Sequence, residues 1–443
     1  MTGSNKGSPS EIRSFLVLIA LLVVTGFIAS LIAGCSGRVV GDGWVHETTE
    51  DGAIRTVRTV SGSVWGGPGR FVEEASIGVR EGADEYMLGR VRSIHVYDGQ
   101  IFLLDGQVPV LRVYDLAGVH LRDIGGGGAG PGEFEDPRSI TIDPGDGTIY
   151  VRDGSLGRII RFTAEGSPID AWPLMAGIST GTQMVMSADG NVYTPVYRID
   201  FEIDLFTKGM ARIGPEGATG DTIYGPESDF EEKDWEVEVR SEDGQSVSID
   251  LVPFSPDEMW VLCPDGSVVG GVSEEYRFEI HSPAGGITVV ETTSERVPVE
   301  PGEARWYRNR LIADFRTVLP GWAWPAGRGI PRFKPAYAQL IPDQSRRVWV
   351  RRQGPGINIE GCDENPEDSS RFYSDPCWQD TFTFDVFDLD GRYLGEVDVP
   401  DGLLARPDPY IEGDMMVALV QDEEGVQYVK RYRLVLSEEN DES

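Results

Sequence analysis

One short stretch of the chain has residue types and spacing that suit ligand binding. It holds two tryptophans and three cations, namely Trp322, Trp324, Arg328, Arg332 and Lys334. Indole rings stack on the faces of sugars, and cationic side chains donate charge-assisted hydrogen bonds to anionic groups. We therefore predict a small-molecule or carbohydrate site here, with Arg351 and Arg352 nearby. The alternative is a packing loop whose cations pair with local acids, because aromatic residues in loops are usually buried.

Residues for covalent catalysis show no recognised spacing, and we predict no catalytic residue. The sequence has no Gly-x-Ser-x-Gly elbow and no His-Glu-x-x-His motif, and its histidines, at 46, 95, 120 and 281, are scattered. The glycine-rich run 125–132 is not a phosphate loop, because no Gly-Lys-Ser/Thr follows and the next element is a predicted strand. Paired acids such as Asp98 with Asp105, or Asp143 with Asp153, lie at turns and strand ends, where they serve the fold. With 73 acids in the chain, oxygen ligands for a metal ion occur by chance, so their spacing decides nothing.

The charge of the chain excludes one class of partner. Its 443 residues contain 39 Lys and Arg against 73 Asp and Glu, which gives a net charge of −34. Phosphate contacts need clustered cations, so we predict no nucleic-acid partner. The same charge gives no attraction to anionic lipid.

The amino terminus has the pattern of an export signal. Residues 1–14 are polar with two cations, and an almost unbroken apolar run follows from 15 to 32. The sequence Leu31-Ile32-Ala33-Gly34-Cys35 resembles the lipobox of bacterial lipoproteins. This resemblance implies that 1–34 is a signal peptide and that Cys35 carries the lipid that holds the protein at a membrane. We expect a polar tether over 35–52 and a location in the cell envelope, facing the periplasm or the exterior. The alternative is an uncleaved amino-terminal anchor.

The other cysteines fit an oxidising compartment. Cys362 and Cys377 bracket a polar loop, and we predict a disulfide between them, with two free thiols as the alternative. Cys263 lies in a strand-like run and is predicted to be a buried free thiol.

Internal repetition predicts the fold that positions these residues. Arg-Ser-Ile at 92–94 recurs at 138–140, and each copy begins a strand, an Asp-Gly turn and further strands. Related turns place their second residue at 99, 147, 190, 266, 344 and 425. Four strands per unit, at a period in the forties, are typical of a propeller blade. We predict an all-β, six-bladed propeller over 53–437, followed by an acidic tail at 438–443.

The later blades carry insertions, and the ring needs a closing strand. The insertions are 226–251, predicted as an extra hairpin, 298–335, predicted to begin a helix at Pro301, and 353–380, which holds the two cysteines. The last blade lacks its outermost strand, which the runs 54–60 and 75–78 can supply. Such closure removes an exposed sheet edge.

The run Gly127-Gly128-Ala129-Gly130-Pro131-Gly132-Glu133-Phe134, continuing through Pro137-Arg138-Ser139-Ile140, resembles the NHL repeat. The whole chain is similar to exported bacterial six-bladed propellers of the NHL-like type, many of them lipoproteins. This similarity implies a surface binding or protein-interaction module. Some six-bladed relatives, such as gluconolactonase-like enzymes, hold a divalent metal on the ring axis. The alternative function is therefore a metal-dependent hydrolase or lactonase with oxygen ligands for a divalent cation in the central channel. A third hypothesis is a purely structural acidic surface protein.

Overall fold

The computed structural model describes residues 37–41, 43–174, 184–200, 205–365, 370 and 376–436. The predicted signal peptide, Cys35 and the acidic tail lie outside the described residues.

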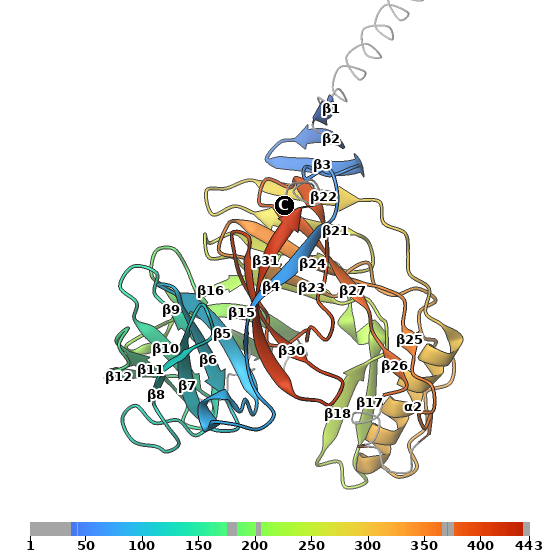
Figure 1. Ribbon diagram of the computed structural model, residues 1–443. Helices are drawn as coiled ribbons and strands as arrows, with labels where there is room; N and C mark the ends of the chain where they lie inside the picture. The colour runs from blue at the N-terminus through green and yellow to red at the C-terminus, as the bar shows by residue number, and fades with distance from the viewer. Residues whose placement is uncertain are drawn as a thin grey trace, which may run out of the picture.

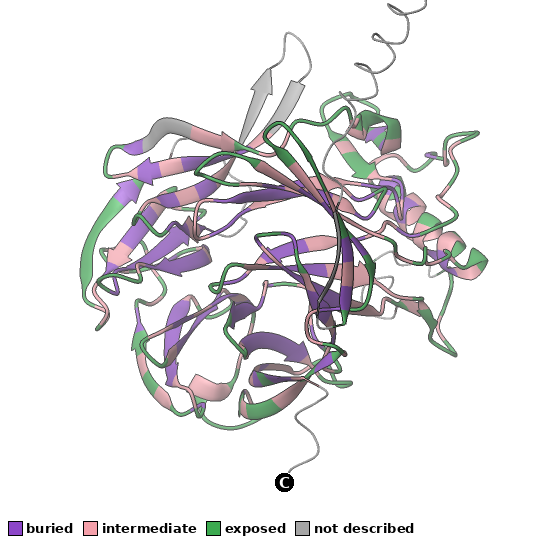
Figure 2. Ribbon diagram, turned by 90° about the horizontal axis from the view of Figure 1, so that it is seen from above, coloured by how far each residue is buried: buried purple, intermediate pink, exposed green. Residues whose placement is uncertain are grey.

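The described chain forms six four-stranded units around a common axis, as the repeats predict (Figures 1 and 2). Blades 1 to 3 contain β5 (Val91–Tyr97), β6 (Gln100–Asp105), β7 (Val110–Asp115), β8 (His120–Ile124), β9 (Pro137–Ile142), β10 (Ile149–Asp153), β11 (Arg158–Phe162), β12 (Pro168–Pro173), β13 (Val185–Met186), β14 (Val192–Asp200), β15 (Leu205–Gly214) and β16 (Gly217–Tyr224).

Blades 4 to 6 complete the ring. They contain β19 (Glu258–Leu262), β20 (Val268–Val272), β21 (Arg277–His281), β22 (Ile287–Thr292), β23 (Gln339–Pro342), β24 (Arg347–Gln353), β27 (Phe382–Asp388), β28 (Tyr393–Asp398), β29 (Tyr410–Glu412), β30 (Met415–Gln421), β31 (Gln427–Leu436) and β4 (Gly69–Ile77). Within each blade the strands pair in antiparallel order, and apolar side chains from facing blades form the cores between them.

The strand ends are held by buried acids. The Asp105 carboxylate, 1% exposed, accepts backbone N–H hydrogen bonds from Gly89, Arg90, Gln107 and Val108. Asp153 has the corresponding role in blade 2, where it accepts from the backbone of residues 135, 136 and 156. These contacts agree with the prediction that such acids serve the fold.

The amino-terminal closure is confirmed, but by one of the two predicted runs. Strand β4 pairs in antiparallel fashion with β31 and supplies the outermost strand of blade 6. The other run, β3 (Ile54–Ser61), instead pairs in parallel with β22, the outer strand of blade 4. The edge of blade 6 is already covered by β4, and β3 lies beside β22 in a register that runs from Ile54 opposite Ile287 to Thr59 opposite Thr292.

Much of the predicted tether is also a sheet. Strands β1 (Gly37–Gly41) and β2 (Trp44–Asp51) form a meander with β3, so blade 4 becomes part of a seven-stranded sheet (Figure 1). Trp44 explains part of this, because its buried ring stacks on His46 at 3.8 Å and its Nε1 donates to Thr59 Oγ1. The polar composition of the segment concealed these contacts.

The three predicted insertions are present. Insertion one contains a short 3-10 helix, η2 (Glu232–Trp235), and the hairpin of β17 (Glu236–Arg240) and β18 (Val247–Leu251). Insertion two contains α2 (Pro301–Val318), with Pro301 in its first turn as predicted. Insertion three contains β25 (Ile357–Asn358), β26 (Trp378–Gln379) and the Cys362–Cys377 disulfide. A further 3-10 helix, η1 (Asp84–Tyr86), precedes blade 1. No helix among the described residues is long and apolar enough to cross a membrane.

Both cysteine predictions for the described residues are confirmed. Cys263 is a free thiol, 2% exposed, and burial raises the pKa of its thiol. A buried thiol with a raised pKa holds little thiolate and is a poor nucleophile.

Removing the disulfide is expected to destabilise insertion three. The bond closes a loop across a sequence separation of 15 residues, and a loop of this length contributes about 3 kcal/mol in the chain-entropy model. The variant Cys362→Ser/Cys377→Ser should therefore unfold at a lower urea midpoint than the oxidised protein. Reducing the wild type with dithiothreitol should give the same shift, and an unchanged midpoint in both experiments would contradict the prediction.

Candidate functional site

The three insertions meet at one mouth of the propeller, where they form a layer that we call the insertion layer: the β17–β18 hairpin, residues 298–335 and residues 353–380. Val237 and Val239 of the hairpin pack against Leu311 and Phe315 of α2. At the other end of α2, Trp306 packs against the buried Cys377 of the disulfide. The sequence predicted these insertions one by one, and the structure joins them.

The two tryptophans of the predicted ligand site are part of this packing. Trp322 is 8% exposed, its ring lies 4.8 Å from that of Phe315, and its Nε1 donates to the carbonyl of Glu238 at 3.0 Å. Trp324 is half-buried, and its Nε1 donates to the Arg328 carbonyl at 2.7 Å. These contacts are those of the packing alternative.

Two cations of the predicted site also make contacts within the protein. Arg328 donates to the carbonyls of Asp234 and Glu236, so it holds the segment that leads into the hairpin. Lys334 is 1% exposed and lies 2.7 Å from Glu303 Oε1 and 3.4 Å from Asp380 Oδ1.

The remaining predicted residues lie elsewhere. Arg332 is exposed, and its carbonyl accepts from the Val299 N–H. The Arg351 guanidinium lies 4.3 Å from the Phe382 ring, and Arg352 pairs with Glu396 and lies 3.8 Å from Asp385. The structure therefore does not bring the seven predicted residues together on one open surface.

One histidine lies on the innermost strand of blade 1. His95 of β5 is near Tyr410 of β29, with ring centroids 5.0 Å apart, and burial lowers its pKa to about 4. Its imidazole is therefore neutral at physiological pH. Within the described residues, no group of three or more His, Cys, Asp or Glu side chains is placed to hold a metal ion.

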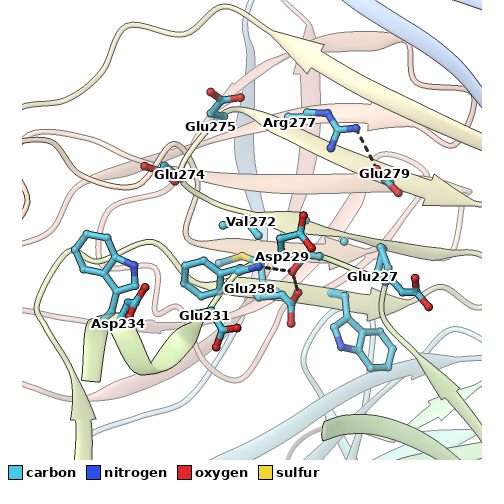
Figure 3. Close-up of a pocket in the computed structure, with 18 residues that line it drawn as sticks. Glu227, Asp229, Glu231, Asp234, Glu258, Val272, Glu274, Glu275, Arg277 and Glu279 are labelled. Carbon is cyan, nitrogen blue, oxygen red and sulfur yellow. Dashed lines mark hydrogen bonds and ion pairs between the residues drawn. The ribbon is translucent and has the colours of Figure 1, made fainter. Parts of the chain in front are cut away.

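A pocket that the sequence analysis missed lies beside the insertion layer. It has a volume of about 470 Å³ and lies between residues 226–235, which follow blade 3, and the ends of β19, β20 and β21 in blade 4 (Figure 3). We call it the acidic pocket. Its lining includes eight carboxylates, from Glu227, Asp229, Glu231, Asp234, Glu258, Glu274, Glu275 and Glu279.

The acidic pocket has one lining cation, and that cation is already paired. Arg277 lies 3.1 Å from Glu279 and 3.7 Å from Glu291. Most of the carboxylates have no such partner: within the described chain, no ion pair is formed by Glu227, Asp229, Glu231, Glu274 or Glu275. The pocket therefore presents unbalanced negative charge to any solute that enters it.

Aromatic rings form the apolar part of the same pocket. Phe230, Trp235 and Trp260 line it, and all three are partly buried. An aromatic face attracts ammonium and guanidinium groups through its quadrupole. Carboxylates beside aromatic rings are thus suited to an organic cation.

The sequence alone indicates only one of the two groups of acids that line this pocket. The acids at 231–234 are visible as a charged run in insertion one. Glu274 and Glu275 come from the turn between β20 and β21 in another blade, and only the fold places them opposite that run.

A second pocket, also of about 470 Å³, adjoins the first. The two share Glu274, Glu275 and Arg277, but the second has mixed charge, since Arg296, Lys334 and other cations also line it. Its mixed lining gives no preference for one sign of charge.

Comparisons with known proteins address the fold. A family model described as a 6-bladed beta-propeller (DUF5128) matches residues 81–193. No curated protein matches the sequence. Similar solved structures include a Bacteroides fragilis protein named as exported, with 12% identity, a TM-score of 0.45 and coverage of 83% of this chain and 95% of that chain.

Two further structures are similar at equally low sequence identity. A member of the duf4221 family from Bacteroides vulgatus has 11% identity and a TM-score of 0.43, covering 84% of this chain and 99% of its own. Virginiamycin B lyase from Staphylococcus aureus has 10% identity and a TM-score of 0.33, covering 91% and 96%. At these values the similarities say nothing about ligand or activity. The strand pairing and the family match agree on the architecture, and the chain folds as a six-bladed β-propeller.

Proposed function

We propose that the protein is a binding module of the cell envelope, and that its ligand is an organic cation held in the acidic pocket. One observation supports this most strongly: eight carboxylates and one paired arginine surround a space of about 470 Å³. This volume lies in the range of small-molecule sites. The ligand class that fits is an amine or guanidinium with more than one positive group, such as a polyamine or a basic peptide segment.

Electrostatics favours the capture of such a ligand. A cleft with low-dielectric walls and charge of one sign focuses the field and raises the local concentration of the opposite ion. The net charge of −34 on the whole chain adds to this attraction at long range. The rings of Trp235 and Trp260 then supply contact for the methylene groups between the charges.

The proposed location follows from the amino terminus. The apolar run and the lipobox-like sequence before Cys35 support export and lipidation. The Cys362–Cys377 disulfide fits an oxidising compartment outside the cytoplasm. In a bacterial host fed radiolabelled palmitate, the wild type should incorporate label and Cys35→Ser should not.

Spermidine is a suitable probe for the pocket. We expect it to bind the full-length protein in calorimetric titration, with an affinity that falls as salt is raised, because these carboxylates are solvent-accessible. Glu274→Gln/Glu275→Gln should weaken binding about tenfold, since each lost charge contact contributes up to about 1 kcal/mol.

The matched control changes the same charge at a remote place. Glu81→Gln/Asp84→Asn neutralises two exposed acids before blade 1, where η1 begins. It should leave the affinity within twofold of the wild type. Equal losses in both double variants would mean that only the general charge of the protein attracts spermidine, and no binding to the wild type would refute the proposed function.

A further inference from the structure

One blade departs from the others at its first hairpin turn. In five blades a glycine takes the left-handed conformation there, and the sixth, blade 5, has Arg346 with φ of 61°. The glycines are Gly99, Gly147, Gly190, Gly266 and Gly425, with φ between 69° and 86°. The blade 5 turn has the same closing hydrogen bond as the blade 4 turn, from Asp343 N to Arg347 O. A side chain in this conformation carries steric strain that glycine avoids.

The side-chain ion pair of Arg346 does not offset that strain. Its Nη1 lies 2.7 Å from Asp265 Oδ2 of the blade 4 turn, and the arginine side chain is 66% exposed. An ion pair this exposed contributes little or nothing to stability. Residues held in strained backbone conformations cluster at functional sites. Stability alone therefore does not explain why blade 5 has an arginine at the position where the other five blades have glycine.

A pocket beside Arg346 suggests a role in ligand binding instead. It has a volume of about 190 Å³ and lies at the mouth opposite the insertion layer, where the β19–β20, β21–β22 and β23–β24 turns meet. Three parts of the fold build it: the start of β3 with Arg55, two turns of blade 4 with Ser267 and with Gly285 and Gly286, and two turns of blade 5 with Arg346 and with Asp390. We call it the two-arginine pocket.

The lining of this pocket has more cations than acids, although the chain as a whole is acidic. In the described part of the protein Arg55 forms no ion pair, although Glu50 is its cross-strand neighbour. Two arginines thus line one space, together with Ser267 and Ser282, and among the described residues the Arg346 guanidinium has only the exposed contact with Asp265 to give up. Guanidinium groups bind oxyanions by paired, charge-assisted hydrogen bonds.

We propose that the two-arginine pocket binds inorganic phosphate, independently of the acidic pocket. Asp390, the one acid in the lining, would select among oxyanions. An ionised carboxylate can only accept hydrogen bonds, so it can pair with the proton of hydrogen phosphate but repels sulfate, which has no proton at neutral pH. Phosphate at this site would sit between the amino-terminal sheet and blades 4 and 5.

Calorimetric titration of the full-length protein with phosphate and with sulfate tests the proposal. The wild type should bind phosphate at least tenfold more tightly than sulfate. Arg346→Gly and Arg55→Gln should each weaken phosphate binding at least tenfold, and Asp390→Asn should narrow the gap between phosphate and sulfate. As a matched control, Arg240→Gln removes an exposed, paired arginine on the β17–β18 hairpin and should leave phosphate binding unchanged.

The melting temperature of Arg346→Gly separates a ligand role from a structural one. Because glycine relieves the strain, this variant should melt no lower than the wild type while it loses phosphate. A clear drop in melting temperature would show that the arginine is retained for its ion pair with Asp265, and would overturn the proposal. Absence of phosphate binding to the wild type at 10 mM, or full binding by Arg346→Gly, would overturn it as well.

Discussion

Replacing Lys334 by Met is expected to lower the free energy of unfolding by about 3–5 kcal/mol, the cost of leaving a buried charge without its partner. The ammonium group of Lys334 lies 2.7 Å from Glu303 Oε1, and both side chains are 0% exposed. Without the lysine, Glu303 would remain buried among groups that cannot neutralise it. Asp380, the other partner, is 31% exposed and can be solvated. Urea unfolding should show the loss as a lower midpoint at an unchanged slope.

Two further variants make this prediction specific. Lys334→Met/Glu303→Leu removes both charges, and we expect it to recover most of the loss, because replacing a buried ion pair by apolar residues is often neutral. Lys430→Met breaks the exposed pair with Glu73, at 2.8 Å, and should cost less than about 1 kcal/mol. If Lys334→Met were no more destabilising than Lys430→Met, the buried pair would not hold the insertion layer in place.

The position of this pair explains why its loss should be felt widely. Glu303 is in the first turn of α2, Lys334 is at the end of the same insertion, and Asp380 belongs to insertion three. Tyr307 of α2 also donates to Asp380 at 3.0 Å. The network therefore ties the start of α2 to the end of its own insertion and to insertion three.

The repeats predicted the fold because the interactions that define a blade are local. Asp-Gly turns and alternating apolar residues specify hairpins within some forty residues, and these signals survive even in the divergent blades. The same reasoning identified 75–78 as the closing strand, now part of β4. It placed 54–60 wrongly, because the choice between two open sheet edges depends on contacts with β22 more than 200 residues away.

The sequence could not predict how the site residues are arranged, for a related reason. A sequence shows that Lys334 and Arg328 are cations in an acidic chain. It does not show that Lys334 is paired with Glu303, or that Arg328 donates its hydrogen bonds to two backbone carbonyls. The acidic pocket needs the opposite information, since its acids come from two distant segments, around 231 and around 275. Pairing of charges is a property of the folded chain, so composition could indicate neither the satisfied cations nor the unsatisfied acids.

Replacing Trp322 by Ala is expected to destabilise the insertion layer by about 3–5 kcal/mol, the usual cost of removing a buried tryptophan. The indole fills the space between Phe315 and the hairpin valines, and its Nε1 satisfies the Glu238 carbonyl. Hydrogen exchange should then show faster opening of β17 and of the carboxyl-terminal half of α2, while the blades keep their protection. Trp322→Phe should recover part of the loss, because it refills most of the cavity but cannot donate the hydrogen bond.

The same variant distinguishes the two interpretations of this stretch. If Trp322 is packing, Trp322→Ala should lower stability, and it should weaken spermidine binding only as far as the hairpin loosens the wall that carries Asp234 and Trp235. Trp324 is a half-buried ring in the same cluster, so Trp324→Ala should also lower stability and weaken spermidine binding, each by less than Trp322→Ala does. If instead Trp322→Ala kept full stability and abolished binding of a sugar or an anion, the ligand site predicted from the sequence would be correct. The Trp322 indole is 8% exposed and packs against Phe315, so it offers little ring surface on which a ligand could stack, and the two results exclude each other.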